Sequence, residues 1–141
     1  MLKLKQIEGK RMLLFDTSAL IELLKGNSVL KQYLSKIYCS SISVFELFWA
    51  AKRKGGRQFK FVKALIDRLE IIGVNKTIAI TAASAKINLM EKGQDQGMAD
   101  LLIGASVVDL GGTLVSFDQD FSVIAKEMKF KLDYHEMTKP N

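Results

Sequence analysis

The chain has few of the residues that build disulfides, zinc sites and histidine-based active sites. Its 141 residues include one cysteine, one histidine and one proline. Cys39 therefore has no internal disulfide partner, and its apolar setting, KIYCSSIS, predicts a buried side chain. The scarcity of cysteine favours a cytoplasmic protein. One cysteine and His135, which is predicted to fray with the polar end DYHEMTKPN, cannot supply a structural zinc site.

Long hydrophobic runs are missing as well, so no membrane attachment is expected. Asp, Glu or Gly interrupts each apolar stretch well before the roughly 20 residues that a membrane-spanning helix needs. The start, MLKLKQIEGKR, lacks the apolar segment and cleavage site of a signal peptide. Because MLLFDTSAL begins cleanly at Met12, residues 1–11 are predicted to be an optional extension of one domain spanning residues 1–141. Neither a P-loop, G-x-x-x-x-G-K-[ST], nor a nucleophile elbow, G-x-S-x-G, occurs.

Short apolar stretches alternate with longer segments of helical period, a pattern that predicts an α/β fold. The strands are predicted at residues 12–15, 37–42, 69–74, 113–117 and 129–134. The helices are predicted at residues 18–25, 30–35, 43–53, 59–68, 77–92, 98–110 and 120–128. Strands separated by helices, without tight hairpins, indicate a mostly parallel sheet covered on both faces.

Acidic residues stand next to the predicted ends of several strands. Asp16 directly follows the first strand and Asp118 the fourth, while Glu46 begins the helix after the second strand. Asp100 lies in the first turn of the helix at residues 98–110. Because open parallel sheets place ligands beyond the carboxyl ends of their strands, three of these four acids are expected at one edge of the sheet.

Each acid also has a purely structural explanation. The stretch SVFE matches a capping box, in which Glu46 reaches back to the backbone N–H of Ser43. Asp100 can complement the positive end of its helix, and Asp16 or Asp118 can cap the turn that leaves its strand. Capping does not require the acids to converge, however. Four carboxylates close together match a hard divalent cation, Mg²⁺ or Mn²⁺, which activates water for attack at phosphorus.

Positive charge is concentrated in one stretch of the chain. Lys and Arg total 21 against 15 acidic residues, and the segment KRKGGRQFKFVK, residues 52–63, has no acid at all. This segment is either a solvated helix face with a basic turn or a surface that faces a polyanion. The neighbouring Trp49 and Phe59 are predicted to lie in the core rather than to stack on bases.

Four stretches, taken in order, resemble the motifs of PIN-domain ribonucleases, in particular the VapC-type toxins of toxin–antitoxin pairs. They are LLFDTSALIELL, SSISVFEL, GMADLLIGASV and GGTLVSFDQDF. The resemblance runs from Met12 to about Tyr134. It implies a PIN-like three-layer α/β/α sandwich with a central, mostly parallel five-stranded sheet, which agrees with the pattern of strands and helices.

The resemblance also implies the residues of the site. Its metal-binding and catalytic acids would be Asp16, Glu46, Asp100 and Asp118. Its supporting hydroxyls would be Thr17, Ser18 and Ser116. Of the two hydroxyls beside the first acid, one is expected to hydrogen-bond to it. Asp120, which could instead cap the following helix, and Asp95, in the loop before the third motif, are further candidate metal ligands.

The function that follows is divalent-metal-dependent endoribonuclease activity, with water as the nucleophile. Because an acidic cleft repels RNA, phosphate contacts are expected from basic residues beyond the Glu46 helix. The candidates are Lys52, Arg53, Lys54 and Arg57. As partners, the resemblance implies an RNA substrate, a small antitoxin protein and a second copy in a homodimer.

Other classes of protein remain as alternatives. One is a non-catalytic PIN-like module for RNA binding or assembly, and another is an RNA-processing PIN nuclease that has no antitoxin. A phosphoryl-transfer receiver is disfavoured, because it would need paired acids after the first strand and a lysine at the end of the last strand. The chain has Phe15-Asp16 and Asp133-Tyr134 at these two places.

Overall fold

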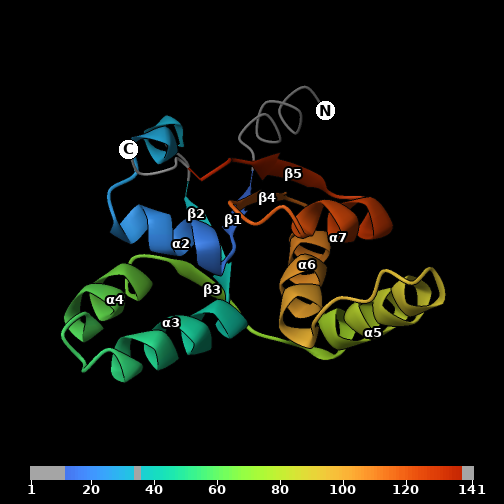
Figure 1. The fold of residues 1–141 in the computed structure, drawn as a ribbon, viewed down its shortest axis with the longest axis horizontal. Coiled ribbons are helices and arrows are strands. Elements are labelled where there is room, and N and C mark those ends of the chain that lie inside the picture. The colour runs from blue at the N-terminus through green and yellow to red at the C-terminus, as the bar shows by residue number, and fades with distance from the viewer. Residues whose placement is uncertain (1–11, 34–35, 138–141) are drawn as a thin grey trace, which may run out of the picture.

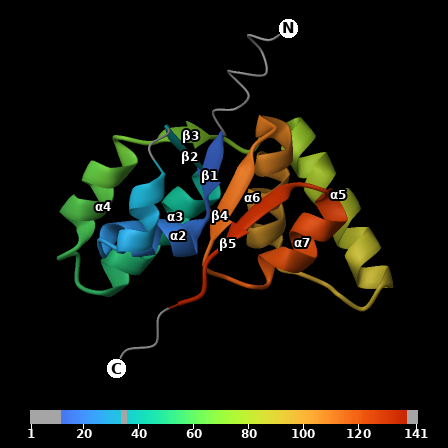
Figure 2. The same ribbon diagram turned by 90° about the horizontal axis from the view of Figure 1, so that it is seen from above.

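The computed structural model describes residues 12–33 and 36–137 and is drawn as a ribbon in Figures 1 and 2. The strands are β1 (Leu13–Phe15), β2 (Ile37–Ser40), β3 (Glu70–Ile72), β4 (Thr113–Ser116) and β5 (Lys131–Tyr134). The helices are α2 (Thr17–Leu24), the 3₁₀ helix η1 (Ser28–Gln32), α3 (Ser41–Arg53), α4 (Phe59–Ile66), α5 (Lys76–Glu91), α6 (Met98–Leu110) and α7 (Phe121–Met128).

The five strands form one sheet in the order β3-β2-β1-β4-β5, and each neighbouring pair is parallel. In the centre, Leu13 of β1 lies between Ile37 of β2 and Thr113 of β4. The chain adds β2 and β3 on one side of β1 and then β4 and β5 on the other. The carboxyl ends of β1 and β4 therefore meet at the point where the strand order reverses, which is where such sheets bind ligands.

Helices cover both faces of this sheet, which confirms the predicted three-layer sandwich. Figures 1 and 2 show α2, α3 and α4 on one side and α5, α6 and α7 on the other. Alternate residues of β1 face opposite layers, as strand geometry requires: Phe15 packs in the first core with Leu20 and Leu47, and Leu14 packs in the second with Leu101.

Two adjacent glycines, Gly111 and Gly112, allow the chain to turn after α6 and β4 to pair closely with β1. Gly111 ends α6 in a left-handed conformation with φ of 68°, which glycine adopts without steric cost. A Cβ atom on Gly112 would collide with the backbone oxygen of Met12. That oxygen accepts a hydrogen bond from the Thr113 backbone N–H at 2.8 Å, so the close approach starts the β1–β4 pairing.

The alternative explanation of Glu46 as the partner of Ser43 in a capping box is wrong. Strand β2 ends at Ser40, earlier than the sequence pattern indicated, and α3 starts at Ser41. Ser40 is the N-cap, and its side chain accepts a hydrogen bond from the Ile42 backbone N–H at 3.1 Å. Glu46 therefore lies beyond the first turn of α3, where it has no capping role.

The structure confirms the prediction made for the chain's one cysteine and contradicts the prediction made for its one histidine. Cys39 is fully buried in β2, as predicted, and burial raises the pKa of its thiol to about 12. His135 does not fray: its backbone N–H donates to the Ser116 oxygen at 2.9 Å, and its Nε2 lies 2.6 Å from the Tyr33 hydroxyl. Its ring also packs on Phe117, with ring centroids 5.4 Å apart, so the segment after β5 is attached to the end of β4.

Parts of the chain that carried predictions are not described. Residues 1–11, predicted to be an optional extension, lie outside the described residues, as does the end of the helix predicted at 30–35. The described beginning of this predicted helix lies in the 3₁₀ helix η1, which spans Ser28–Gln32. Within residues 12–33 and 36–137, no helix combines the length and hydropathy needed to cross a membrane.

Candidate active site

Asp16 lies at the junction of β1 and α2 and is held by three hydrogen bonds. Its Oδ1 accepts from the Ala19 backbone N–H at 2.8 Å and from the Ser18 hydroxyl at 2.7 Å. Its Oδ2 accepts from the Ser116 hydroxyl at 2.5 Å. Burial, with only 2% of the residue exposed, raises the pKa of the Asp16 carboxyl above its ordinary value, although these hydrogen bonds act to lower it. Asp16 therefore caps α2 and also carries a firmly positioned carboxylate.

The two serines that hold Asp16 also attach the loop after β4. Ser116, buried at the end of β4, accepts a hydrogen bond from the Asp118 backbone N–H at 2.9 Å. The Ser18 hydroxyl accepts a hydrogen bond from the Phe117 backbone N–H, also at 2.9 Å. The first turn of α2 and the loop after β4 are thereby joined, and Asp118 comes to lie beside Asp16. The negative charge of Asp118 contributes to the raised pKa of Asp16.

Glu46 reaches the same edge of the sheet from α3. The Thr17 hydroxyl donates to Glu46 Oε1 at 2.6 Å and lies 2.9 Å from the hydroxyl of Ser43. Of the two hydroxyls beside Asp16, Ser18 therefore contacts that acid, whereas Thr17 contacts Glu46. The sequence reading missed Ser43 as a contact of Thr17. Its spacing of one helical turn from Glu46 was the available signal, because residues i and i+3 share a helix face.

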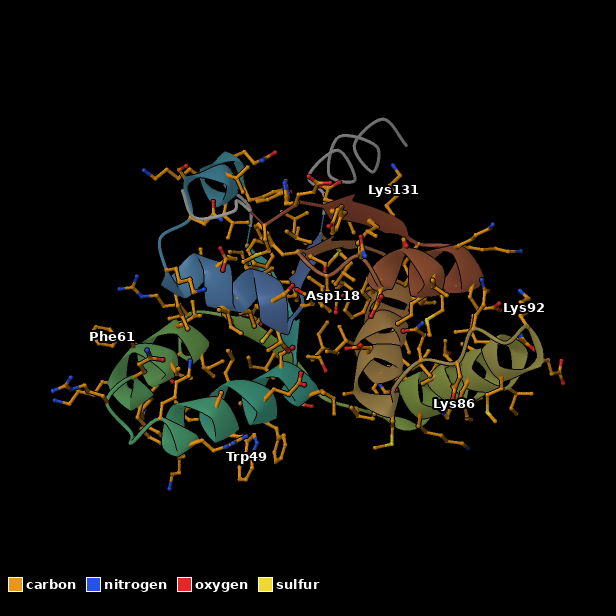
Figure 3. All side chains as sticks on the ribbon, in the orientation of Figure 1. Trp49, Phe61, Lys86, Lys92, Asp118 and Lys131 are labelled. Carbon is orange, nitrogen blue, oxygen red and sulfur yellow. The ribbon has the colours of Figure 1, made fainter. Side chains whose placement is uncertain are left out.

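Asp100, in the first turn of α6, completes the group. Burial first, and then the negative charges of the surrounding acids, raise the pKa of its carboxyl from 3.8 to about 6. The acids concerned are, in decreasing order of effect, Asp118, Glu46, Asp16 and Asp120. The charges of Asp16, Glu46 and Asp118, the three other acids of the predicted group, therefore all act on Asp100. Figure 3 shows Asp118 near the middle of the molecule, between α2 and α6.

Asp120 and Asp95 differ in their relation to this group. Asp120 stands at the N-cap position of α7, but its side chain makes no capping hydrogen bond, and its charge is one of those that act on Asp100. Its backbone N–H donates to Asp118 Oδ1 at 3.0 Å. Asp95 is exposed and pairs with Lys86 at 2.8 Å, a contact that lowers the pKa of its carboxyl. The structure thus places Asp120 at the border of the acid group and Asp95 in a separate ion pair.

The donor set fits a hydrated divalent cation better than a cation enclosed by protein. Among residues 12–33 and 36–137, no three His, Cys, Asp or Glu side chains lie close enough to form a ready-made metal site. The pKa of Asp100 is nevertheless raised first by burial and then by four neighbouring acids, so negative charge is concentrated at this edge. Mg²⁺ retains several waters and is commonly bound through one or two carboxylates, so a converging but open set of carboxylates suits it.

The predicted RNA-binding residues lie on the same helix as Glu46 and just beyond it. Lys52, Arg53, Lys54 and Arg57 are all exposed. Arg53 is seven positions after Glu46 in α3, which corresponds to roughly 10 Å along the helix axis. The prediction of a buried Trp49 is wrong: 58% of its surface is exposed, and the Arg53 guanidinium lies 5.8 Å from its ring centroid. Phe59 is half-buried against Phe48, as expected of a residue at the border of the core.

Replacing Thr17 with valine is expected to weaken metal binding about 10-fold or more. Valine keeps the shape of threonine but removes the hydroxyl that orients Glu46, and loss of such an outer contact commonly costs 10–100-fold in metal affinity. Calorimetric titration with Mn²⁺ measures the effect, and Thr17→Ser, which retains the hydroxyl, is the matched control. Equal affinities for the valine variant and the parent chain would show that Glu46 does not need Thr17.

Comparisons with known structures identify the fold. The DNA-bound VapBC complex from Salmonella typhimurium has a chain 22% identical over 88% of this chain and 98% of its own, with a TM-score of 0.76. A chain of VapBC-1 from nontypeable Haemophilus influenzae is 20% identical over 87% and 97%, with a TM-score of 0.71. A chain of VapBC-5 from Mycobacterium tuberculosis is 19% identical over 88% and 97%, with a TM-score of 0.68.

Comparisons of sequence identify the family. A search of curated proteins gives no match. The family described as PIN domain matches residues 13–127, which span every strand except β5 and include all four acids. The match covers most of the chain, and the all-parallel five-stranded sheet agrees with it. The chain therefore belongs to the PIN domain family.

Proposed function

We propose that this PIN domain is a ribonuclease that hydrolyses RNA phosphodiester bonds with the help of Mg²⁺ or Mn²⁺. The observation that carries the proposal is that Asp16, Glu46, Asp100 and Asp118 come together from different parts of the chain at the carboxyl edge of the sheet. Burial first, and then the charges of the other three acids, raise the pKa of Asp100 there. Helix caps need no such convergence. A bound divalent cation would supply charge neutralisation and a reactive water at this edge.

Within this proposal the acids have different roles. Asp16 is buried and held by three donors, so it is a rigid anchor for the cation. Asp100 and Asp118 approach from α6 and the loop after β4 and provide further carboxylate ligands. Glu46, whose Oε1 is fixed by Thr17, orients the attacking water. No side chain is required as nucleophile, in keeping with the position of His135 against Tyr33 and Phe117.

The test is to incubate the purified chain with structured RNA, single-stranded RNA and DNA of the same sequence. We expect cleavage of RNA in Mg²⁺ or Mn²⁺, no cleavage with chelator, and little cleavage of the DNA. Recovery of cleavage when metal is restored to the chelated sample would separate a metal requirement from inactivation. Intact RNA under all metal conditions would favour the alternative of a non-catalytic RNA-binding or assembly module.

The basic residues at the end of α3 are the proposed phosphate contacts. Replacing Lys52 and Lys54 with glutamine is expected to weaken RNA binding and to make it less sensitive to salt. Each lost contact to single-stranded RNA lowers the slope of log affinity against log salt by about 0.7. Fluorescence anisotropy with labelled RNA at several salt concentrations measures that slope. Lys126→Gln with Lys129→Gln removes the same charge elsewhere, and an equal effect from this control would refute the assignment.

A role as the toxin of a toxin–antitoxin pair is the more specific form of the proposal. Structures that share the fold include VapBC complexes and a toxin–antitoxin complex from Klebsiella pneumoniae. In this chain, residues of α2, α3 and α4 and of their flanking turns line an open pocket of about 200 Å³. Its lining includes the apolar Leu24, Leu47 and Phe61 and the basic Lys25 and Lys54. Apolar walls with lysines suit an antitoxin segment that carries apolar and acidic side chains.

A further inference from the structure

A cluster of aromatic and polar side chains lies where the end of η1 meets the end of β5. Tyr33, the residue after η1, is only 8% exposed, and its ring packs edge-to-face against Phe15 with centroids 5.7 Å apart. His135, the residue after β5, packs its ring on Phe117. Phe15 and Phe117 are the residues directly before the first and the last of the four acids. The cluster therefore contacts the neighbours in sequence of two acids of the candidate site.

Hydrogen bonds join the members of this cluster. The Tyr33 hydroxyl donates to Asp133 Oδ2 at 3.3 Å and lies 2.6 Å from His135 Nε2. Because a hydroxyl has one proton, both contacts are satisfied when His135 carries a proton on Nε2 and donates it to the tyrosine oxygen. The His135 backbone N–H donates to the Ser116 oxygen at 2.9 Å, one residue beyond the β4–β5 pair Ser116 and Tyr134. Tyr33 is thus connected through His135 to the end of β4.

The turn after β4, which this cluster covers, supplies the contacts that hold two of the acids. The Ser116 hydroxyl donates to Asp16 and accepts from the Asp118 backbone N–H. The Phe117 backbone N–H donates to Ser18, whose hydroxyl in turn donates to Asp16. Metal ligands work only when they are held within about 0.5 Å of their productive positions. A side chain that fixes Phe117 therefore bears on the geometry of the candidate metal site.

We propose that Tyr33 and His135 form a clamp, the Tyr33–His135 clamp, that positions the acid group. Their hydrogen bond holds the His135 ring against Phe117. The fixed Phe117 in turn keeps Asp16 and Asp118 at the spacing that a shared cation requires. This positioning role rests on the proposed metal-dependent function, since it concerns the acids of that site. Neither side chain of the clamp contacts the cation or the RNA in this role.

The first test removes one hydroxyl and measures metal binding without RNA. Tyr33→Phe keeps the ring against Phe15 but loses the bond to His135. We expect it to weaken Mn²⁺ binding about 10-fold in calorimetric titration, as loss of an outer contact commonly does. A merely stabilising role would lower the unfolding temperature and leave the Mn²⁺ affinity unchanged. The matched control is Tyr38→Phe, which removes a hydroxyl from a half-buried tyrosine of β2 and should bind Mn²⁺ as the parent chain does.

A double variant tests whether the two residues act as a pair. His135→Phe keeps a ring against Phe117 without the donor, and it should weaken Mn²⁺ binding by a factor similar to that of Tyr33→Phe. Combining the two changes should cost no more than either alone, because both remove the same hydrogen bond. His135→Gln, whose amide N–H can donate to Tyr33 in place of Nε2, should recover part of the lost affinity.

Hydrogen exchange in chelator measures the positioning directly and does not depend on metal binding. Tyr33→Phe should speed the exchange of the Phe117 and Asp118 backbone amides at least about 10-fold, and leave that of Ile78, at the start of α5, unchanged. Unchanged exchange at both amides, a Tyr33→Phe variant that binds Mn²⁺ as tightly as the parent chain, or additive losses in the double variant would each overturn the clamp. If the parent chain itself binds no Mn²⁺ while the two amides respond as expected, the clamp stands and the metal-dependent function fails.

Discussion

An Asp100→Asn variant is expected to lose at least about 100-fold of the metal-dependent RNA cleavage while becoming more stable than the parent chain. Asparagine occupies nearly the same volume but carries no charge, so it removes one proposed metal ligand. It also removes a carboxylate whose pKa is raised to about 6 by burial and by its acidic neighbours. Cleavage rates in Mn²⁺ and thermal unfolding in chelator measure the two effects separately.

The sign of the stability effect follows from the direction of the pKa shift. Between pH 4 and pH 6 the folded chain binds more protons at Asp100 than the unfolded chain, so stability falls as pH rises through this window. Above about pH 6 the destabilisation is complete. Asp100→Asn should therefore add about 1–2 kcal/mol at pH 7, after allowance for screening by solvent, and little below pH 4. Metal binding to the parent chain should weaken as pH falls through about 6, because protons compete for the same carboxylate.

The matched control is Asp109→Asn, an exposed carboxylate on the same helix. It should change neither the cleavage rate nor the stability difference between pH 4 and pH 7. If Asp100→Asn cleaves RNA as fast as the parent chain does, the acid group is not the catalytic site. If it is less stable than the parent at pH 7 in chelator, the carboxylate makes a favourable contact that outweighs the repulsion.

The presence of acids at the carboxyl edge of the sheet could be predicted from the sequence, because it depends on the topology of the sheet rather than on side-chain detail. Alternating apolar strands and helices imply a parallel sheet, and a parallel sheet brings the ends of all its strands to one side. Asp16 after β1 and Asp118 after β4 lie near each other because these two strands are neighbours, an order that was not predicted from the sequence. The place of Asp100 in the group was implied by the resemblance to PIN domains and not by the strand pattern.

The partners of these acids were harder to predict, because they depend on exact helix starts and on contacts between distant residues. A shift in the start of α3 from Ser43 to Ser41 converts Glu46 from a predicted cap into a side chain available to the site. Thr17 and Ser18 are adjacent and chemically alike, yet they face different acids because successive residues of a helix point in different directions. Sequence spacing alone does not determine which of two hydroxyls contacts which acid.

The exposure of Trp49 was also not predicted, but for a different reason. A large aromatic residue in an amphipathic segment is normally assigned to the core, since burial is its usual source of stability. In α3 the core positions are already taken by Ser43, Leu47 and Ala51, so Trp49 faces outward, as Figure 3 shows. A helix that packs against the core on one side leaves the residues of its other side exposed to solvent. Such exposed residues are visible only once the packing of the neighbouring elements is known.

Replacing Asp16 with alanine is expected to abolish cleavage, as Asp100→Asn does, but with the opposite effect on stability. The Asp16 carboxylate accepts hydrogen bonds from Ala19, Ser18 and Ser116, and its removal would leave these buried donors without their acceptor. Loss of an N-cap costs about 1 kcal/mol and a hydrogen bond to a charged group about 1.5–3 kcal/mol. Burial of the charge offsets part of this, as the raised pKa of Asp16 indicates. We expect a net loss of about 2–4 kcal/mol, seen as a fall of roughly 10 °C in the unfolding temperature.

Asp16→Asn separates the structural role of this residue from its chemical one. The amide oxygen can still accept the hydrogen bonds from Ala19 and Ser18, and the Ser116 hydroxyl can rotate to accept a bond from the amide nitrogen. The asparagine variant should therefore be about as stable as the parent chain in chelator or more stable, because burial raises the pKa of the Asp16 carboxyl and the amide leaves no charge to bury. It should nevertheless be inactive, because the charge that anchors the cation is gone. The alanine and asparagine variants would then share the loss of cleavage but differ in stability, since only alanine leaves the three donors without acceptors. Equal unfolding temperatures for Asp16→Ala and Asp16→Asn in chelator would contradict that distinction.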